Sequence, residues 1–294
     1  MKKLIAGIIQ QKSAATPDAN REKIAGAVTL AIKQGARLVV LQELHNTPYF
    51  CQNENAENFD FAEPVPGPST NFFSDLAKDL GVVLVTSLFE KRAPGVYHNT
   101  AVVLENDGQI AGKYRKMHIP DDPGYYEKYY FTPGDLGFKP IETSIGKLGV
   151  LVCWDQWYPE AARLMALAGA DLLIYPTAIG WEPTDGQDEK DHQLEAWTTI
   201  QRSHAIANGI PVISANRVGF EENPEKKGEG IDFWGGSFLA DGQGKILARA
   251  GNHEEETVVA AIDLEQSEKL RRTWPFFRDR RIDAYKDLTK RFRD

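Results

Sequence analysis

The sequence predicts an α/β protein with mixed sheets, and two features of its patterning support this prediction. Short runs rich in Val, Ile and Leu alternate with longer stretches in which apolar residues recur every three or four positions, as in amphipathic helices. The runs Leu148–Val152 and Leu172–Ile174 are apolar without alternation, which is typical of strands covered on both faces. Whether the strands form one sheet or two stacked sheets does not follow from the pattern alone.

The predicted elements alternate along the chain. We expect strands at 3–10, 37–42, 82–90, 97–105, 147–152, 171–175, 211–216, 235–240 and 256–262. We expect helices at 18–34, 69–80, 158–169 and 189–208. Pro17 marks the start of the first helix, and Gly35 and Gly81 mark the ends of the first two. The order around 147–175 predicts a parallel strand pair joined by a crossover helix.

The connections are of two kinds. Short turns at Asn106-Asp107-Gly108 and Asp241-Gly242 predict hairpins. Polar stretches at 121–135, 180–190 and 219–232 contain Pro, Gly, Asp and aromatic residues and are too long for simple turns. We therefore expect these stretches to be loops that form the walls of a functional site.

Composition indicates a globular protein, and a single domain over 1–294 is the simplest arrangement. The 294 residues are 42% hydrophobic and 26% charged, without a low-complexity linker or a repeat. A net charge of −8, with the two signs well mixed, disfavours nucleic acid as a partner. No apolar stretch approaches the roughly 20 residues that span a bilayer, so we expect no membrane partner. Only two cysteines, Cys51 and Cys153, suit a reducing, cytoplasmic setting.

Three residues of complementary chemistry come directly after predicted strands. Cys153 follows an apolar run and precedes a predicted helix start at Pro159, and amides at a helix N-terminus favour the thiolate. Glu43 follows the strand at 37–42, and Lys116 follows a further strand, Ile110-Ala-Gly-Lys-Tyr-Arg115. Singly, each has an ordinary structural explanation, as a small buried side chain or a surface charge. Because ligands of open α/β sheets bind at the carboxyl ends of strands, we expect the three to share one site.

These three groups are the ones that acyl transfer from an amide requires. A buried glutamate can accept the thiol proton as a general base. A lysine can stabilise the oxyanion of a tetrahedral intermediate. We therefore predict that Glu43, Lys116 and Cys153 are catalytic residues of an enzyme that cleaves a carbon–nitrogen bond.

Three segments resemble the signature segments of the nitrilase, or carbon–nitrogen hydrolase, superfamily. They are Leu41-Gln-Glu43-Leu44, Lys113-Tyr-Arg-Lys116-Met-His-Ile-Pro120 and Gly149-Val-Leu-Val-Cys153-Trp-Asp155. Their order and approximate spacing match, and Arg278-Asp-Arg-Arg281 is also similar to that family. The resemblance covers essentially the whole chain. It implies a four-layer αββα sandwich, no metal or organic cofactor, and assembly into a homo-oligomer of two or more subunits.

The resemblance also implies a catalytic role for Glu127, which matches a second glutamate that the superfamily often carries near the lysine. From the residues alone, Glu127 is a carboxylate in an aromatic-rich loop. It partners Lys116, positions substrate or lies on the surface.

Longer stretches, at 43–52, 117–135 and 175–183, resemble the N-carbamoylputrescine amidohydrolase branch of the superfamily. That branch hydrolyses N-carbamoylputrescine to putrescine, carbon dioxide and ammonia, which completes polyamine biosynthesis from agmatine to putrescine. The resemblance implies the same reaction here, through a thioester-type intermediate on the cysteine. The alternative is an amidase or an N-carbamoyl-amino-acid amidohydrolase that uses the same three residues.

The charge at the far end of the pocket distinguishes these substrates. A small-molecule ureido-amine needs an apolar tube that ends in a carboxylate, whereas N-carbamoyl amino acids need arginine or another donor. Glu182 lies in the loop after the strand beside the cysteine strand, and we predict that it binds the substrate ammonium. We predict that Tyr49, Tyr130 and Trp154 form walls around the methylene chain, although each ring can equally occupy an ordinary place in the core or rim. We also expect the backbone N–H of Trp154 to be available as a donor to the oxyanion.

Other classes of protein fit the sequence less well. The His and Cys spacings of common zinc sites are missing, as is the Gly-x-Ser-x-Gly turn of serine hydrolases. A catalytically silent binding protein on the same fold would have no need of all three reactive residues. The stretch 263–294 carries ten Lys/Arg and seven Asp/Glu with interleaved aromatic rings, a balance too even for nucleic acid. We predict a C-terminal arm that contacts its own body or a neighbouring subunit.

Overall fold

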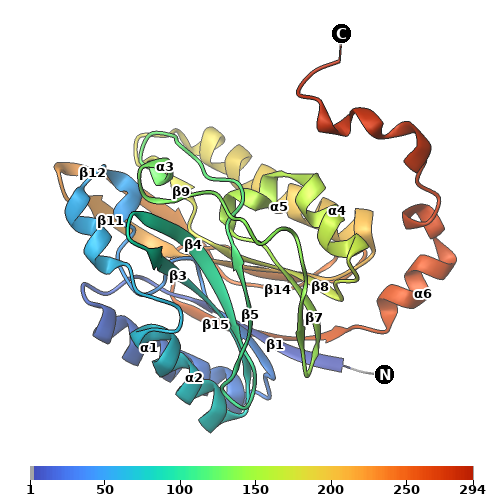
Figure 1. Cartoon of the computed structure of the whole chain (residues 1–294), viewed down its shortest axis with the longest axis horizontal. Helices are drawn as coiled ribbons and strands as arrows, with labels where there is room; N and C mark the ends of the chain where they lie inside the picture. The colour runs from blue at the N-terminus through green and yellow to red at the C-terminus, as the bar shows by residue number, and fades with distance from the viewer. Residues whose placement is uncertain (1–2, 294) are drawn as a thin grey trace.

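The structure, a computed structural model, describes residues 3–293 and has four main layers (Figure 1). Two helices cover the outer face of one six-stranded sheet, a second six-stranded sheet packs against its inner face, and two further helices cover the second sheet. The αββα sandwich that the resemblance implied is therefore confirmed.

The first sheet has the strand order β15-β1-β2-β3-β4-β5. Its strands are β1 (Lys3–Gln10), β2 (Leu38–Val40), β3 (Val83–Ala93), β4 (Val96–Leu104), β5 (Ile110–Arg115) and β15 (Glu256–Asp263). The neighbours β1, β2 and β3 are parallel and the other pairings are antiparallel. The helices α1 (Pro17–Lys33) and α2 (Pro68–Leu80) lie on its outer face.

The second sheet has the strand order β14-β13-β10-β8-β7-β6. Its strands are β6 (Ile141–Thr143), β7 (Gly146–Val150), β8 (Leu172–Thr177), β10 (Val212–Asn216), β13 (Phe238–Ala240) and β14 (Ile246–Arg249). The helices α4 (Pro159–Leu167) and α5 (Gln187–Asn208) cover it. The strands β7 and β8 are parallel and α4 connects them, as the sequence predicted.

A small third sheet, with the order β11-β12-β9, corrects two predictions of loops. Residues expected to form a loop at 219–232 instead form a hairpin of β11 (Val218–Asn223) and β12 (Lys226–Trp234), to which β9 (Gly180–Trp181) adds. The expected loop at 180–190 likewise contains β9 and the first turn of α5. Pairing within the hairpin and with the more distant β9 stabilises this charged segment, and local hydrophobicity does not reveal such pairing.

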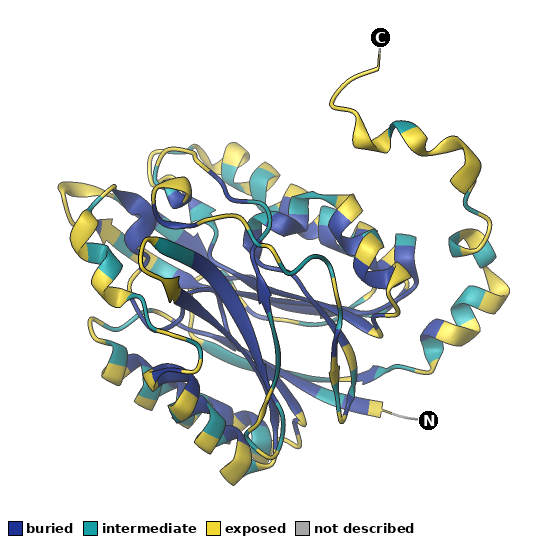
Figure 2. Ribbon diagram, viewed as in Figure 1, coloured by how far each residue is buried: buried dark blue, intermediate teal, exposed yellow. Residues whose placement is uncertain are grey.

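Strands of the first sheet bury both faces, and successive residues belong to different cores. Leu38 and Val40 pack between the two sheets, whereas Val39 packs against α1 and α2. Ile8 and Ile9 divide in the same way. This two-residue alternation explains why the sequence shows unbroken apolar runs, because every position is covered. The strands are accordingly buried while the outer helical faces are exposed (Figure 2).

The predicted boundaries agree closely with the structure. Thr16 caps α1 by accepting a hydrogen bond from the N–H of Ala19, and Pro17 is its first residue. Gly81 ends α2 with a φ of 62°, a left-handed conformation that glycine adopts without strain. The turns that follow Asn106 and Asp241 join β4 to β5 and β13 to β14 as hairpins.

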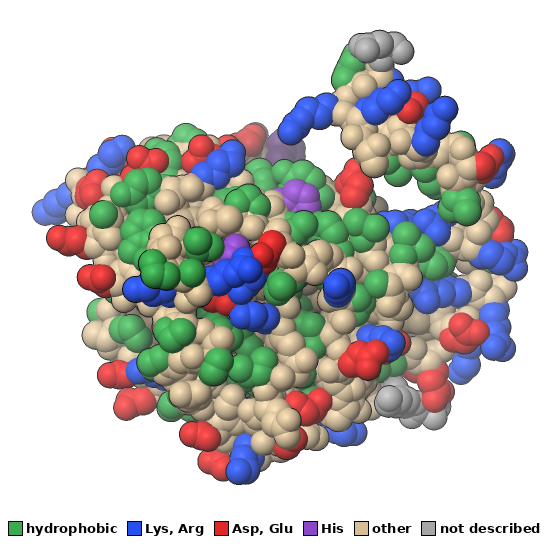
Figure 3. All heavy atoms as spheres, in the orientation of Figure 1, with side chains coloured by type: hydrophobic (Ala, Val, Ile, Leu, Met, Phe, Trp, Pro, Cys, Tyr) green, Lys and Arg blue, Asp and Glu red, His purple; other side chains and the backbone are tan. Residues whose placement is uncertain are grey.

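Residues 264–293 form an arm that leaves the sandwich (Figures 1 and 3). Its helix α6 (Gln266–Thr273) contacts the body, since the Arg271 guanidinium donates to the Asn208 carbonyl at 2.9 and 3.1 Å. Farther along, Ile282, Leu288 and Phe292 are 73%, 66% and 81% exposed. The arm therefore carries a series of uncovered apolar side chains.

The remaining helices are short. They are α3 (Glu127–Tyr130) and the 3₁₀ helices Phe50–Gln52, Ala56–Phe61, Cys153–Trp157, Pro275–Phe277, Ile282–Ala284 and Lys286–Thr289. Of all helices within residues 3–293, none combines the length and apolar character needed to cross a bilayer.

Candidate active site

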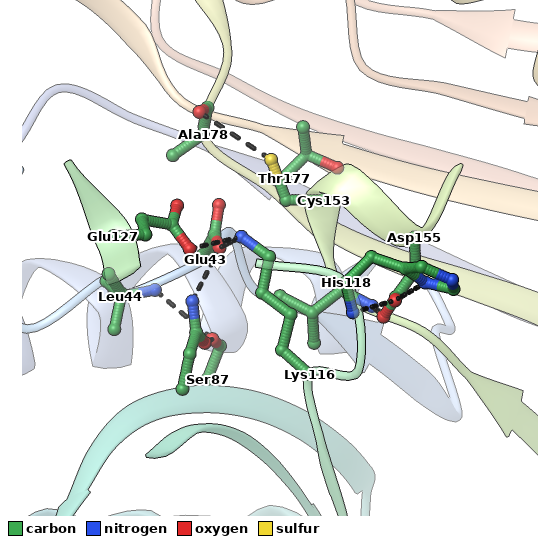
Figure 4. Close-up of polar contacts among 12 residues, drawn as sticks. Glu43, Leu44, Ser87, Lys116, His118, Glu127, Cys153, Asp155, Thr177 and Ala178 are labelled. Carbon is green, nitrogen blue, oxygen red and sulfur yellow. Dashed lines mark hydrogen bonds and ion pairs between the residues drawn. The ribbon is translucent and has the colours of Figure 1, made fainter. Parts of the chain in front are cut away.

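Four side chains predicted to be catalytic meet in one cluster, to which three strand ends and one short helix contribute (Figure 4). Glu43 comes three residues after β2, Lys116 directly follows β5, and Cys153 lies just beyond β7. Glu127 is the first residue of α3. All four are buried. β2 lies in the first sheet and β7 in the second, and each is parallel to a neighbour in its own sheet. The site therefore lies where the two sheets face each other.

Lys116 is the centre of this cluster. Its Nζ lies 2.9 Å from Oε1 of Glu43 and 2.6 Å from Oε2 of Glu127. Burial acts to lower the pKa of Lys116, but the negative charges of Glu127 and Glu43 outweigh it and hold the pKa well above its usual value. The lysine is therefore a fixed cation, and it brings a positive charge beside the thiol.

The Glu43 carboxylate has one occupied and one free oxygen. Oε1 accepts hydrogen bonds from Lys116 and, at 2.7 Å, from Nδ2 of Asn99. No donor within residues 3–293 bonds to the buried Oε2. A buried acceptor without a donor is costly, and at a reactive site such an atom is available to take a proton.

The backbone around Glu43 is held by a buried arginine. The Arg217 guanidinium donates to the carbonyl oxygens of Glu43, Leu44 and Thr47 at 3.1, 2.8 and 3.0 Å. Leu44 has a φ of 48°, a left-handed conformation that strains a non-glycine residue. The arginine therefore stabilises a strained turn that directs the glutamate into the site.

Glu127 contacts Lys116 on one oxygen and Tyr49 on the other. The Tyr49 hydroxyl donates to Oε1 of Glu127 at 2.7 Å. Burial raises the pKa of Glu127 to about 7, while Lys116 acts to lower it and Glu43 to raise it. Two carboxyl groups share a single lysine cation, so at neutral pH one of them readily holds a proton.

Cys153 occupies a tight turn after β7. Its φ is 44°, and its Sγ lies 3.8 Å from the carbonyl oxygen of Ala178. Burial and the charge of Glu43 raise the pKa of Cys153 well above its usual value, and the opposing effect of Lys116 is smaller. The expectation that helix amides favour the thiolate is therefore wrong: the cysteine begins a short 3₁₀ helix, and α4 starts only at Pro159. The resting group is a thiol that needs a base.

Asp155 links the cysteine turn to the segment that follows Lys116. Its carboxylate accepts hydrogen bonds from the N–H of Val152 at 2.9 Å and from the Tyr114 hydroxyl at 2.8 Å. It also accepts from the N–H of His118 at 3.1 Å, and the Nδ1 of His118 lies 2.6 Å away. This buried carboxylate therefore fixes the nucleophile relative to the lysine.

The cysteine opens into a cavity of about 390 Å³. Cys153 and Glu127 lie at its buried end, and its walls include the rings of Tyr125, Trp154, Trp157 and Trp234. Three further carboxylates, those of Asp122, Glu182 and Asp185, line the same cavity, and Asp122 and Glu182 are exposed to solvent. Over the described chain, no Lys or Arg belongs to the lining. The cavity is thus an apolar tube with an acidic mouth.

The structure places two of the four predicted substrate-binding residues in this lining, Trp154 and Glu182. Tyr49 is not in the lining, because it lies behind Glu127 and holds that carboxylate. Tyr130 is not there either: its ring packs against Phe50, Phe59 and Phe89, and its hydroxyl donates to the Asn53 carbonyl at 2.6 Å. These two predictions of wall residues are therefore corrected.

Sequence reasoning missed several residues of the site, namely Asn99, Asp155, Arg217, Tyr125 and Trp234. Asn99 carried a recognisable signal, since the polar sequence His98-Asn99-Thr100 interrupts an otherwise apolar strand, and Asp155 ends one of the three signature segments. As for metals, the structure of residues 3–293 contains no group of three or more His, Cys, Asp or Glu side chains placed to hold an ion.

Comparison with known proteins identifies the class. Residues 5–272 match the model of the carbon-nitrogen hydrolase family. The chain belongs to this family, and the nitrilase superfamily resemblance is confirmed. It is accordingly a hydrolase that acts on carbon–nitrogen bonds.

Three relatives place the chain more closely. It is 47% identical to an N-carbamoylputrescine amidase of Solanum lycopersicum, over 89% of this chain and 86% of that protein. It is 39% identical to a citrullinase of Francisella tularensis, over 93% of each protein. A crystal structure of a carbon-nitrogen hydrolase from Helicobacter pylori G27 has 56% identity and a TM-score of 0.96, and covers 99% of this chain and 100% of that one.

Proposed function

We propose that this protein hydrolyses N-carbamoylputrescine to putrescine, carbon dioxide and ammonia. The acidic mouth of the cavity, formed by Asp122, Glu182 and Asp185, is the observation that carries this proposal. N-Carbamoylputrescine has a ureido group, four methylenes and a terminal ammonium. Its ureido group suits the buried end at Cys153, its methylenes suit the aromatic walls, and its ammonium suits the carboxylates. The identity to N-carbamoylputrescine amidases supports the same substrate.

The lining argues against N-carbamoyl amino acids as main substrates. Their carboxylate would approach Asp122, Glu182 and Asp185 without an arginine or lysine among the described wall residues to receive it. Repulsion between like charges disfavours such a complex. Citrulline, the substrate named by one relative, carries a carboxylate as well as an ammonium and is therefore the most informative competitor.

In the proposed first step, Cys153 attacks the ureido carbonyl carbon while the free Oε2 of Glu43 takes the thiol proton. The electron pair of the carbonyl moves to oxygen, and Lys116, together with the backbone N–H of Trp154, stabilises this oxyanion. Lys116 is already held in place by Glu127, so little reorganisation is needed.

The tetrahedral intermediate then collapses. Glu43 returns the proton to the leaving nitrogen, the carbon–nitrogen bond breaks, and a thioester forms on Cys153. A water molecule, deprotonated by Glu43, attacks the thioester and releases the thiol and a carbamic acid. The carbamic acid loses carbon dioxide, so that one water and one ureide yield carbon dioxide, ammonia and the diamine.

We also propose that the protein is one domain whose arm, residues 263–294, joins subunits of a homo-oligomer. The uncovered side chains of Ile282, Leu288 and Phe292 support this proposal, because solvent exposure of so many apolar groups on one segment is unfavourable. A second subunit would bury them and leave the body unchanged.

The proposed setting is the cytoplasm, in polyamine biosynthesis from agmatine. Both cysteines of the chain are free thiols, which suits a reducing compartment. The reaction would consume a ureide made from agmatine and supply putrescine.

Three matched substrates test the proposed function. N-Butylurea has the ureido group and four carbons of N-carbamoylputrescine but no ammonium, whereas citrulline adds a carboxylate. We expect kcat/KM for N-carbamoylputrescine to exceed both by roughly tenfold or more, measured as ammonia release. Equal kcat/KM values for N-butylurea and N-carbamoylputrescine would show that the acidic mouth does not contribute to recognition of the substrate. A higher kcat/KM for citrulline would make the protein a citrullinase.

A further inference from the structure

We propose that Asn99 is a positioning residue that turns the Glu43 carboxylate so that one oxygen stays free for the thiol proton. This inference rests on the proposed function only in taking Glu43 as the base for Cys153. Asn99 lies near the middle of β4 and is fully buried. Its side-chain donor is bound to Glu43, so we infer that it acts through Glu43 and not on the substrate.

Two contacts of Asn99 carry the argument. Its Nδ2 donates to Oε1 of Glu43 at 2.7 Å, the same oxygen that Lys116 binds at 2.9 Å. Its backbone carbonyl accepts the N–H of Lys116 at 2.9 Å. A single residue thus anchors both the base and the cation. Because both donors bind Oε1, the carboxylate plane is fixed and Oε2 is the oxygen left for Cys153.

The amide of Asn99 is itself oriented by a relay on its other side. The N–H of Leu44 donates to Oγ of Ser87 at 3.2 Å (Figure 4). Ser87 in turn donates to Oδ1 of Asn99 at 3.4 Å. With its oxygen facing Ser87, the amide presents its N–H group to Glu43. Because Leu44 directly follows Glu43, this chain of hydrogen bonds also links Asn99 to the turn that carries Glu43.

A donor to an ionised carboxylate stabilises the charged form, so loss of Asn99 makes protonation of the base easier. The other titratable groups whose charge is felt at Glu43 stay in place in an Asn99 variant. They are Lys116, Glu127, Cys153, Cys51, Tyr49 and Tyr125, together with the Arg217 guanidinium that donates to the Glu43 carbonyl. A shift in the acidic limb of the pH–rate profile therefore reports the missing donor.

The neighbouring residue provides a matched control. Thr100 is also buried on β4, and its hydroxyl donates at 2.6 Å to a different buried carboxylate, that of Glu90. Thr100→Ala removes one buried hydrogen bond to a glutamate without touching Glu43. Any effect that it shares with Asn99→Ala is therefore due to stability alone.

The experiment compares wild type, Asn99→Ala, Asn99→Asp and Thr100→Ala. The rate of Cys153 alkylation by iodoacetamide is measured from pH 5 to 9, together with the melting temperature. For Asn99→Ala we expect the midpoint of the acidic limb to rise by about one pH unit. Asn99→Asp keeps the side-chain size and replaces the donor by an acceptor. We therefore expect its midpoint to rise at least as far. Thr100→Ala should lower the melting temperature and leave the midpoint unchanged.

The outcomes separate this proposal from the proposed function. Midpoints within about 0.2 units of wild type in whichever Asn99 variants fold would overturn the positioning role. A rise in Thr100→Ala equal to that in the Asn99 variants would also overturn it. Alkylation needs no ureide, so these results hold even if N-carbamoylputrescine is not a substrate. The acidic limb of kcat/KM should move by the same amount on any substrate that the wild type hydrolyses.

Discussion

Lys116 binds one oxygen of Glu43, at 2.9 Å, and leaves the other oxygen facing the thiol with no donor from residues 3–293. The ammonium is therefore a partner of the base and at the same time a cation beside the nucleophile. Because Lys116 also binds Glu127, its position does not depend on substrate. Such preorganisation means that charge developing on the substrate carbonyl meets a cation already in place.

Replacement of Glu43 by Gln should abolish turnover. Glutamine keeps an oxygen for Lys116 and Asn99 but has no group that accepts the thiol proton. We expect kcat/KM to fall by at least about 10³-fold with the fold intact by circular dichroism. Glu105→Gln is the control, since the Glu105 carboxylate accepts hydrogen bonds from the N–H groups of Asn106 and Ser144 and not from residues of the site. A Glu43→Gln enzyme as active as the control would exclude Glu43 as the base.

Glu127 should make stability depend on pH. Burial raises its pKa from 4.5 to about 7, so the folded state binds this proton more tightly than the unfolded chain. The stability that it contributes is present below about pH 4.5 and is lost as the pH rises to about 7, on the order of 3 kcal/mol. Denaturant unfolding of wild type and Glu127→Gln at pH 5 and pH 8 measures it. The free energy of unfolding of the wild type should fall relative to that of the variant between pH 5 and pH 8. A difference between the two proteins that is the same at both pH values would contradict the assignment.

Neutralising Glu182 should weaken recognition of the ammonium. We expect Glu182→Gln to raise KM for N-carbamoylputrescine by about fivefold, because an ion pair at an exposed site is worth at most about 1 kcal/mol. Hydrolysis of N-butylurea should be unchanged. Asp122→Asn and Asp185→Asn, tested in parallel, show which carboxylate binds the amine. If all three variants keep the wild-type KM, the ammonium does not bind at the acidic mouth.

Changes in the arm should alter assembly. Leu288 is 66% exposed on the arm, and we expect Leu288→Asp to lower the molar mass measured by light scattering coupled to size exclusion. Leu30→Asp is the matched control, since Leu30 is also an exposed leucine but lies on α1, which covers the first sheet, and not on the arm. An unchanged mass for Leu288→Asp, with the wild type oligomeric, would show that this part of the arm is not in the interface.

Much of the fold could be predicted because its signals are local. Helices such as α1 and α2 have apolar periodicity and clear ends, and the buried strands are unbroken apolar runs. The hairpin of β11 and β12 escaped prediction because its residues are charged. In the structure β12 pairs with β9 at Trp181, and Glu221 of β11 forms an ion pair with the buried Arg217, and neither interaction follows from the hydrophobicity of the segment. The number of sheets was not predictable either, because the hydrophobic pattern of a strand does not show which other strands pair with it.

The site was predictable in part. Glu43, Lys116 and Cys153 each follow a strand, and strand ends converge in α/β proteins, so their proximity could be anticipated. Tyr49 and Tyr130 lie in aromatic-rich segments whose side-chain directions the sequence does not specify, and both point away from the cavity lining. The pKa of the Cys153 thiol depends on its burial and on the Glu43 carboxylate, which are properties of the folded site that the sequence does not show.

The central claim is that Cys153 cleaves N-carbamoylputrescine, and ammonia release from that compound by wild type and Cys153→Ala tests it most directly. We expect steady turnover by the wild type and no ammonia above background from the variant, with equal melting temperatures within about 3 °C. Turnover by Cys153→Ala near the wild-type rate would contradict the assignment of the nucleophile. A wild type that releases ammonia from citrulline but not from N-carbamoylputrescine would contradict the assignment of the substrate.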